Sequence, residues 1–488
     1  MGGIIADNSS APQELRWESI AELAAQVRSG KTKAADLVEK SLAQIAKLEE
    51  YKAIIATTAE RARERAKQID AKVANGEDPG RLAGVPFIAK DNFLVFGADT
   101  TAASNILKGF DAPYQSAVIK KLEAEGAICV AKANLDAFAH GASTENSDFF
   151  TTLNPHDKTR VPGGSSGGSA ASVALGIAPF ALGTDTGGST RQPGSFVGIV
   201  GYKPTYGLMS RSGIVAMASS LDTVGTFARN IDDASLVIDV MAGKDELDST
   251  TIDRDTMGYA DVQGDLTGKK IGIIKEYMGE GLADDVREQI EQAIAKMREA
   301  GAEVTEVSLP SISLALAVYY ILCPAEVSSN LSRFDGQRYG YAYADAANLD
   351  ESYTKSREIG FGKEAKRRIM IGTYVLSSGY YDAYYKKAQT VRTKLIQEAE
   401  AAFKQVDFLI GPVAPTTAFK IGENANNPLA MYLADVMTVA INLIGVPAVS
   451  IPCGVSGENG LPVGLQLIAP QHKDRALLEL AKATEEIL

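Results

Sequence analysis

Apolar residues recur every three or four positions near the beginning of the chain, which is the spacing of an amphipathic helix. Two such runs lie between Glu14 and Leu48, separated by the polar segment Ser29 to Thr32, and a third covers Thr58 to Val73. This pattern predicts N-terminal helices within residues 14–75 that pack onto the rest of the protein.

Short apolar segments alternate with helical patterns over the remainder of the chain. This alternation predicts an α/β layered fold around a central sheet. The strand-like segments are 84–89, 127–131, 178–182, 270–275, 302–307, 407–410, 448–451 and 464–468. The helical patterns are 116–125, 169–175, 231–241, 283–299, 311–334, 362–377, 384–403 and 473–487.

No repeat period and no shift in composition divides the chain. The polar, acidic segment 245–268 is expected to be a surface excursion and not a linker. We therefore expect one large domain over residues 1–488, with a Gly/Ser-rich core at 84–225.

Composition and charge narrow the possible functions. The 488 residues are 45% hydrophobic and 23% charged, which is typical of a globular protein. With 49 basic against 61 acidic residues the net charge is −12, so direct binding to a nucleic acid backbone is disfavoured. The longest apolar stretch, Ala170 to Leu182, is shorter than the roughly 20 residues of a membrane span.

The cysteines and the N-terminal sequence bear on the cellular compartment. Cys129, Cys323 and Cys453 are scattered and form no CxxC pair, which favours a reducing compartment. The first fifteen residues have neither the basic and apolar regions of an export signal nor a myristoylation signal, since Ala6 replaces the required Ser or Thr. We expect a cytoplasmic protein without a membrane anchor.

Two glycine-rich loops, 163–169 and 183–189, carry the most informative chemistry. Each precedes a helix-compatible stretch, where backbone N–H groups suit an anion or an oxyanion. Neither loop has the P-loop pattern or the dinucleotide fingerprint, which disfavours a phosphate site. A flexible linker is also disfavoured, because apolar segments follow and flank the loops. A nucleophilic serine is the remaining interpretation.

Such a serine needs a base, and the histidines offer none with a recognisable motif. His140, His156 and His472 all lie outside the loops and are expected to be structural or surface residues. A lysine can serve instead if burial lowers its pKa from about 10.4 toward about 7 to 8. Lys90 is the candidate, because it ends the apolar segment 84–89. The alternative is a lysine that reaches solvent from a strand end.

The loop sequences resemble the amidase signature family. The matching motifs are GGSSGGSAASVALG at 163–176, LGTDTGGSTRQPG at 182–194 and GYKPTYG at 201–207. The family has a lysine, a serine in a cis peptide bond and a nucleophilic serine, which match Lys90, Ser165 and Ser189 in register. The resemblance implies Ser189 as nucleophile, Ser165 as proton relay and Lys90 as base. It also implies a central mixed sheet covered by helices on both faces.

The residues around Ser189 are expected to support this chemistry. Glycines allow the main chain to approach the reacting centre, so the backbone N–H groups of Thr186, Gly187, Gly188 and Ser189 can surround an oxyanion. Two further residues are expected to support the loop, namely Asp185, which would orient it, and Arg191, which would tie it to its surroundings.

Other segments resemble one branch of the family, the glutaminase subunits of tRNA-dependent amidotransferases. The resemblance implies a heterotrimer in which a kinase-like B subunit binds tRNA and a small C subunit completes the complex. Ammonia from glutamine would convert Glu-tRNA(Gln) to Gln-tRNA(Gln), with ATP and Mg used by the partner and neither cofactor nor metal held by this chain. Phe149, Phe150 and Leu208 depart from the pattern at expected rim contacts. The matching segments are 143–147, 218–225, 328–340, 366–392 and 411–419.

Glutamine carries two opposite charges, so a selective pocket needs a cation and an anion. The resemblance implies Arg368 for the carboxylate, Asp435 for the ammonium and Tyr319 at the pocket wall. The apolar neighbours of Asp435 support a special role, because an unpaired buried carboxylate is unfavourable. Arg368 ends a run of three basic residues, a pattern more typical of a solvated helix face.

Two other functions remain open. One is a stand-alone amidase for other carboxamides. The other is a non-catalytic assembly subunit, which the presence of Lys90, Ser165 and Ser189 together disfavours.

Overall fold

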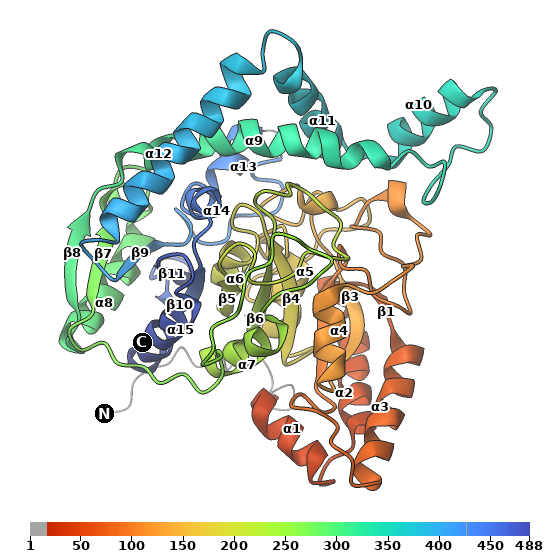
Figure 1. The fold of residues 1–488 in the computed structure, drawn as a ribbon, viewed down its shortest axis with the longest axis horizontal. Coiled ribbons are helices and arrows are strands. Elements are labelled where there is room, and N and C mark those ends of the chain that lie inside the picture. Colours follow the sequence, from red (N-terminus) through yellow and green to blue (C-terminus); the bar gives the residue numbers. More distant parts are fainter. Residues whose placement is uncertain (1–16, 426) are drawn as a thin grey trace.

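One mixed sheet of 11 strands organises the protein. The computed structural model describes residues 17–425 and 427–488 (Figure 1). The strands are β1 (Ile54–Thr57), β2 (Pro86–Lys90), β3 (Ile128–Ala133), β4 (Phe180–Asp185), β5 (Val200–Lys203), β6 (Thr223–Ala228), β7 (Lys270–Ile274), β8 (Glu303–Val307), β9 (Phe408–Pro412), β10 (Ala448–Val455) and β11 (Pro462–Ile468). They are ordered β1-β3-β2-β4-β6-β5-β10-β11-β9-β7-β8.

The sheet combines parallel and antiparallel pairs. β2 runs parallel to β3 and β4, and β7 runs parallel to β8 and β9. Antiparallel pairs, among them β4 with β6 and β10 with β11, join these two parallel groups. Helices flank the sheet, so the predicted mixed α/β fold is confirmed.

Helices pack along the sheet and beyond it. α3 and α4 contact β3, α5 contacts β2 and β4, and α8 and α15 contact β10 and β11. α11 and α12 both pack on α9, at the opposite side of the molecule from α1 to α3 (Figure 1). The helices are α1 (Ile20–Arg28), α2 (Ala34–Lys47), α3 (Ala59–Ala74), α4 (Ala117–Ala124), α5 (Gly167–Ala174), α6 (Arg191–Val197), α7 (Ile231–Met241), α8 (Asp284–Glu299), α9 (Ala315–Asn330), α10 (Leu349–Gly360), α11 (Lys363–Leu376), α12 (Lys387–Ala402), α13 (Pro428–Leu433), α14 (Val439–Ile444) and α15 (Asp474–Ile487).

The N-terminal helices show how local sequence sets their limits. The Ser19 side chain accepts from the N–H of Glu22 and the Glu22 carboxylate accepts from the N–H of Ser19, so this capping box starts α1. α1 ends at Arg28, before the predicted break. Glu14 and Leu15, expected in the first helix, lie outside the described residues, as does the N-terminal sequence used to predict the compartment. The domain limits 14–75 and 84–225 stay predictions.

Helix α9 with its flanking turns is the most apolar long helix. Pro310–Arg333 has 24 residues and a mean hydropathy of 1.5, so it could cross a membrane by length and composition alone. Ala170–Leu182, the longest apolar stretch expected from the sequence, is divided between α5 and β4. Because 56% of the apolar window in Pro310–Arg333 is buried inside the protein, α9 packs as a core helix.

Candidate active site

Lys90 is the last residue of β2 and lies in the protein interior. All five residues of β2 are buried, because β3 and β4 pair with it on both sides. The Lys90 amine lies 2.8 Å from Oγ of Ser165, 2.8 Å from Oγ of Ser166 and 2.9 Å from Oγ1 of Thr184. The alternative of a lysine reaching solvent is wrong, since this side chain is fully buried.

The electrostatic surroundings of Lys90 favour the neutral amine near neutral pH. Burial lowers the pKa of Lys90 to about 7, although the carboxylates of Asp136, Asp185 and Asp222 act in the opposite direction. A substantial fraction of the amine is therefore deprotonated at pH 7, as a general base requires.

The three hydroxyls around Lys90 have different roles. A neutral amine donates two hydrogen bonds and accepts one. The Ser166 hydroxyl donates to the carbonyl of Thr184 at 3.2 Å, so it serves Lys90 as an acceptor. Asn92 Nδ2 donates to Oγ1 of Thr184 at 3.1 Å. In the described part of the chain neither the Ser165 nor the Thr184 hydroxyl contacts an acceptor other than the Lys90 amine. Of the two, Ser165 lies on the glycine-rich loop that contacts the loop of Ser189, so it is the hydroxyl placed to pass a proton from that loop to Lys90.

Gln192 holds the loops of Ser165 and Ser189 against each other. Ser165 follows a cis peptide bond from Gly164, as the family resemblance implies. The Gln192 side-chain oxygen accepts from the Gly164 N–H at 3.0 Å, and its nitrogen donates to the carbonyl of Ala142 at 2.9 Å. The two loops therefore meet three residues after Ser189.

Asp185 receives hydrogen bonds from the loop that follows it. Its buried carboxylate accepts from the N–H groups of Gly188 at 2.8 Å, Thr190 at 3.2 Å and Arg191 at 3.3 Å. The Arg191 guanidinium pairs with it through Nε at 3.1 Å and a terminal nitrogen at 3.0 Å, and Asn442 Nδ2 donates at 2.9 Å. Burial alone would raise the pKa of Asp185, but the Arg191 charge outweighs it and holds the pKa far below the usual range.

Arg191 connects the catalytic loop to the far side of the site. It donates to Gln466 Oε1 at 2.6 Å, to Asn442 Oδ1 at 2.5 Å and to the carbonyl of Thr438 at 3.2 Å. Asp185 and Arg191 thus have the contacts that their expected supporting roles require.

The glycines of the loop fit spaces that no side chain could enter. A Cβ on Gly187 would lie 2.7 Å from the ring of Tyr319, and one on Gly188, whose φ is +133°, would lie 2.1 Å from Oγ1 of Thr438. The Gly188 N–H donates to Asp185, so this amide is not free for an oxyanion and that part of the prediction is corrected. The N–H groups of Thr186, Gly187 and Ser189 have no acceptor within the described residues.

The expected substrate residues come from three helical segments. Tyr319 lies on α9, Arg368 on α11, and Asp435 two residues after α13. Asp435 is 8% exposed, and no donor of the described residues reaches its carboxylate. Burial raises the pKa of Asp435 well above its usual range, while the Arg368 charge acts to lower it. A buried carboxylate without a donor is a suitable site for a ligand cation.

Two of the three guanidinium nitrogens of Arg368 have partners among the described residues, and the third is open. Its side chain is 3% exposed, whereas that of the preceding Arg367 is 45% exposed, so only part of the basic run is solvated. Nε donates to Glu364 at 2.9 Å, and one terminal nitrogen contacts Sγ of Cys323 at 3.9 Å. The other terminal nitrogen has no acceptor among residues 17–425 and 427–488, which leaves it available for a ligand carboxylate.

Arg368 lines a cavity of about 170 Å³ together with Tyr320, Glu364 and Tyr432. The ring of Tyr320 stacks on that of Tyr432 with centroids 3.8 Å apart, and the Arg368 guanidinium lies 5.4 Å from the Tyr320 centroid. The Tyr432 hydroxyl donates to Glu364 at 3.2 Å. Glu364 therefore connects α11 to α13.

The histidines do not take part in the Lys90 network. His140 is buried, and neither of its ring nitrogens has a hydrogen-bond partner among the described residues. Burial together with the nearby Arg368 charge lowers its pKa well below the usual value. His156 Nε2 lies 3.0 Å from the carbonyl of Val197, and His472 sits in a turn with a φ of +65°. In the described ranges no group of three or more His, Cys, Asp or Glu side chains could hold a metal ion.

Several site residues were not predicted from the sequence. Asp136 accepts from the N–H groups of Ser143, Thr144 and Asn146, and its own N–H donates to the carbonyl of Ser165. Asp222 belongs to a polar loop and gave no signal beyond the resemblance of 218–225. Asp136 lies between Leu135 and Ala137, so a charge in an apolar segment was an available signal there. The other unpredicted residues are Ser166, Thr184, Gln192, Glu364, Thr438 and Asn442.

Comparisons with known proteins agree with this geometry. The family model described as Amidase matches residues 36–478. Two similar sequences are the glutamyl-tRNA(Gln) amidotransferase subunits A of Cyanothece sp. (51% identical; 96% of this chain and 97% of the relative) and Geobacillus thermodenitrificans (49%; 96% of both). The crystal structure of the corresponding subunit of Thermotoga maritima is 38% identical, with a TM-score of 0.78 over 97% of this chain and 95% of that one. The chain therefore belongs to the amidase family.

Proposed function

We propose that this chain is the glutaminase subunit of a tRNA-dependent amidotransferase, hydrolysing glutamine to release ammonia. The observation that carries the proposal is the buried Lys90 amine, with a pKa of about 7, at 2.8 Å from the Ser165 hydroxyl. Relatives about half identical over nearly the whole chain bear the name of such a subunit, which supports the same assignment.

The reaction uses Ser189, Ser165 and Lys90 in turn. Ser189 Oγ attacks the side-chain amide carbon of glutamine, its proton moves to Ser165, and Ser165 gives its own proton to Lys90. The protonated relay then supplies a proton to the departing nitrogen, so ammonia leaves and a glutamyl ester of Ser189 remains. Water, activated by the same relay, hydrolyses this ester and releases glutamate.

The loop stabilises the negative charge that develops on the amide oxygen. Of the four amides expected to bind the oxyanion, only that of Gly188 donates to Asp185, so those of Thr186, Gly187 and Ser189 remain available. Fixed N–H donors aimed at a developing oxyanion lower the barrier most when they are held before the reaction begins.

The substrate is selected by its two charges. Asp435 receives the α-ammonium and the open edge of Arg368 receives the α-carboxylate, with Tyr319 beside Gly187 at the pocket wall. Each ligand charge thus meets an opposite charge in a water-poor site.

The ammonia is used by partners that this chain does not contain. The net charge of −12 supports a division of labour in which a kinase-like B subunit binds tRNA and uses ATP and magnesium, with a small C subunit completing a heterotrimer. The product of the complex is Gln-tRNA(Gln). Three buried free cysteines support a reducing cytoplasm.

The test is Ser189→Ala in the assembled enzyme. We expect glutamine hydrolysis to be abolished, while amidation of Glu-tRNA from added ammonium chloride continues, because one hydroxyl is lost without loss of core volume. Retained glutaminase activity would show that the nucleophile is misassigned. If the isolated wild-type chain hydrolysed simple carboxamides as fast as glutamine, it would be a stand-alone amidase.

A further inference from the structure

The segment 218–225, which the resemblance marked without giving it a role, places Asp222 behind the catalytic loop. Asp222 is 7% exposed and precedes β6. Its carboxylate accepts from the N–H of Met217 at 2.9 Å and the N–H of Ala218 at 3.1 Å. The third donor is the hydroxyl of Thr186, at 2.7 Å.

The sheet register explains why Asp222 meets this loop. Thr223, the first residue of β6, pairs with Asp185, the last residue of β4. The loop of Ser189 starts immediately after Asp185, so Asp222 and Thr186 leave the sheet side by side. Asp185 holds the far part of the loop through Gly188 and Thr190, whereas Asp222 holds its first residue.

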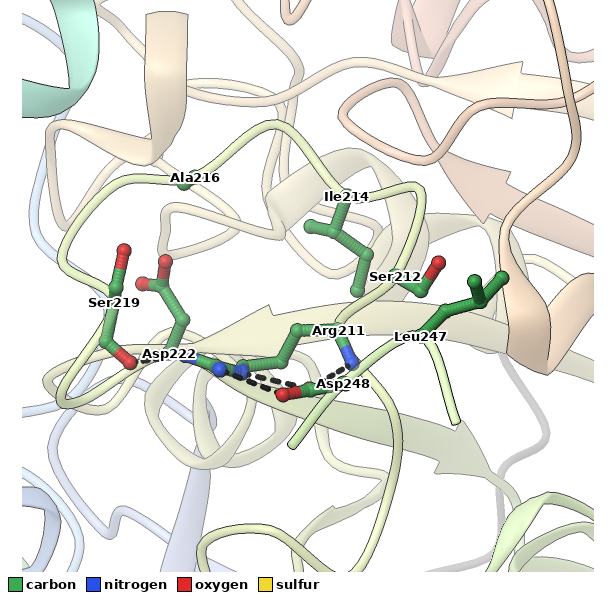
Figure 2. A pocket seen from close by; sticks show the side chains of 8 residues that line it. All are labelled: Arg211, Ser212, Ile214, Ala216, Ser219, Asp222, Leu247 and Asp248. Atoms are coloured by element: carbon green, nitrogen blue, oxygen red, sulfur yellow. Dashed lines mark hydrogen bonds and ion pairs between the residues drawn. The ribbon is translucent and has the colours of Figure 1, made fainter. Parts of the chain in front are cut away.

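Asp222 also faces a cavity of about 210 Å³ on the side of Arg211. Figure 2 shows Asp222 and Ser219 on one wall and the Arg211–Asp248 ion pair nearby, with Nε and a terminal nitrogen of Arg211 directed at Asp248. Arg211 is thus occupied by Asp248 and by the carbonyl of Ser219. Within the described residues no cation forms an ion pair with Asp222.

We propose that Asp222 is a positioning residue for the reaction at Ser189, because it fixes Thr186 and with it the amides that receive the oxyanion. The inference rests on the proposed amide hydrolysis but not on the identity of the amide. Its carboxylate does not touch the substrate. It acts through the Thr186 hydroxyl, so the removal of either partner has the same consequence for the loop.

Charge gives Asp222 a second, separable effect. The charged groups that act with it are Lys90 on β2, Glu326 on α9, and the Arg211–Asp248 pair. The Asp222 carboxylate raises the pKa of Lys90, opposing burial. Burial raises the pKa of Asp222 itself to about 6, so it is mostly ionised at pH 7. Removing its charge should lower the pKa of Lys90. Removing the Thr186 hydroxyl should lower the pKa of Lys90 by less, because that hydroxyl only helps to keep Asp222 ionised.

The experiment compares Asp222→Asn, Thr186→Val, Thr186→Ser and the Asn/Val double variant in the assembled enzyme. For Asp222→Asn and Thr186→Val we expect kcat for glutamine to fall about 10- to 100-fold with KM nearly unchanged, since the amides are displaced but the pocket is not. Thr186→Ser keeps the hydroxyl and should stay close to wild type. The double variant should be no worse than the poorer single variant.

The pH profile of kcat/KM separates positioning from general damage to the fold. Its rising limb should move to lower pH in Asp222→Asn and should move by less in Thr186→Val. Asp233→Asn is the matched control, because Asp233 is also buried, accepts from a backbone N–H at 2.7 Å and has a pKa raised to about 6, but lies on α7 away from the loop. It should leave kcat unchanged.

Three results would overturn the inference: activity of Asp222→Asn within twofold of wild type, equal losses in both Thr186 variants, or independent losses that multiply in the double variant. An inactive wild-type enzyme would instead contradict the proposed function.

Discussion

Asp185 and Asp435 are both buried aspartates of one site, yet their surroundings are opposite. Asp185 accepts hydrogen bonds from three backbone amides, Asn442 and the paired Arg191 guanidinium, and its pKa lies far below the usual range. Asp435 has no donor among the described residues, and its pKa is raised by burial. A carboxylate that is already satisfied holds the structure, whereas one that is buried and unsatisfied favours a cationic ligand. In the proposed mechanism the catalytic groups are therefore in place before substrate arrives, and the substrate itself supplies the cation that Asp435 lacks.

Lys90→Arg should have the largest effect on activity, because it changes a catalytic group that is in place before substrate binds. A guanidinium cannot be deprotonated at working pH, so we expect hydrolysis of every amide to fall roughly 100- to 10,000-fold. In the wild type kcat/KM should rise with pH through about 7, because the pKa of Lys90 is lowered to about 7 and only the neutral amine accepts a proton. Steady-state rates between about pH 6 and 9 measure both. Near-normal turnover in the arginine variant would exclude the base role.

Asp185→Asn should damage stability and activity together. The variant leaves the Arg191 charge buried without its anion, which typically costs about 3–5 kcal/mol of unfolding free energy. Thermal unfolding should show a lower Tm, and hydrolysis of glutamine and of butyramide should fall alike. An unchanged Tm would mean that Asn442 and Gln466 suffice to hold Arg191.

Asp435→Asn should have the opposite effect on stability. Removing an unpartnered buried charge should keep or raise the Tm at pH 7, since the raised pKa shows that the folded state disfavours the ionised form. Glutamine should lose about 2–5 kcal/mol of binding, or roughly 30-fold or more in kcat/KM. Arg368→Ala should show the same loss on glutamine. Butyramide, which lacks both charges, should be nearly unaffected; equal losses on the two substrates would contradict the assigned pocket.

Glu364→Gln should give the smallest effect. It removes the anion that orients Arg368 but leaves the guanidinium in place, so we expect a rise of about fivefold to tenfold in KM for glutamine and little change in kcat. Glu358→Gln on α10 is the control, because its exposed carboxylate pairs with Lys355 and does not line the cavity beside Arg368. A similar rise in both variants would assign the effect to surface charge.

The strands and helices that the sequence predicted are those whose residue types are typical of the element they form. Every predicted strand and helix occurs, because each combines a clear apolar period with suitable residues. β5 and β6 were missed because Gly201 and Gly225 interrupt them, and α6 because Pro193 and Gly194 are unusual in a helix. β1, α10, α13 and α14 were also missed. β1 is a half-buried edge strand of four residues.

The site residues also divide into those that stand out from their neighbours in sequence and those that do not. Lys90 and Asp435 were recognisable because a charge in an apolar segment is unusual. Arg368 was ambiguous within its basic run, yet the buried residues Ala365, Arg368, Gly372 and Val375 are spaced at three and four along α11, a signal that was available. Asp222 acts through Thr186, which is distant in sequence, and no local pattern records that contact. Glu364 lies four residues before Arg368 on α11, so its spacing was a signal that the sequence carried.

Thr438 connects the proposed ammonium site to the catalytic loop. Its hydroxyl lies 2.6 Å from the carbonyl of Gly187 and 3.1 Å from the carbonyl of Asp435. If Asp435 receives the α-ammonium as proposed, this connection sets how far that charge lies from Ser189. Asparagine carries both charges and the same amide but is shorter by one methylene, so we expect it to be a poorer substrate than glutamine. The proposed site would therefore select its substrate by length as well as by charge.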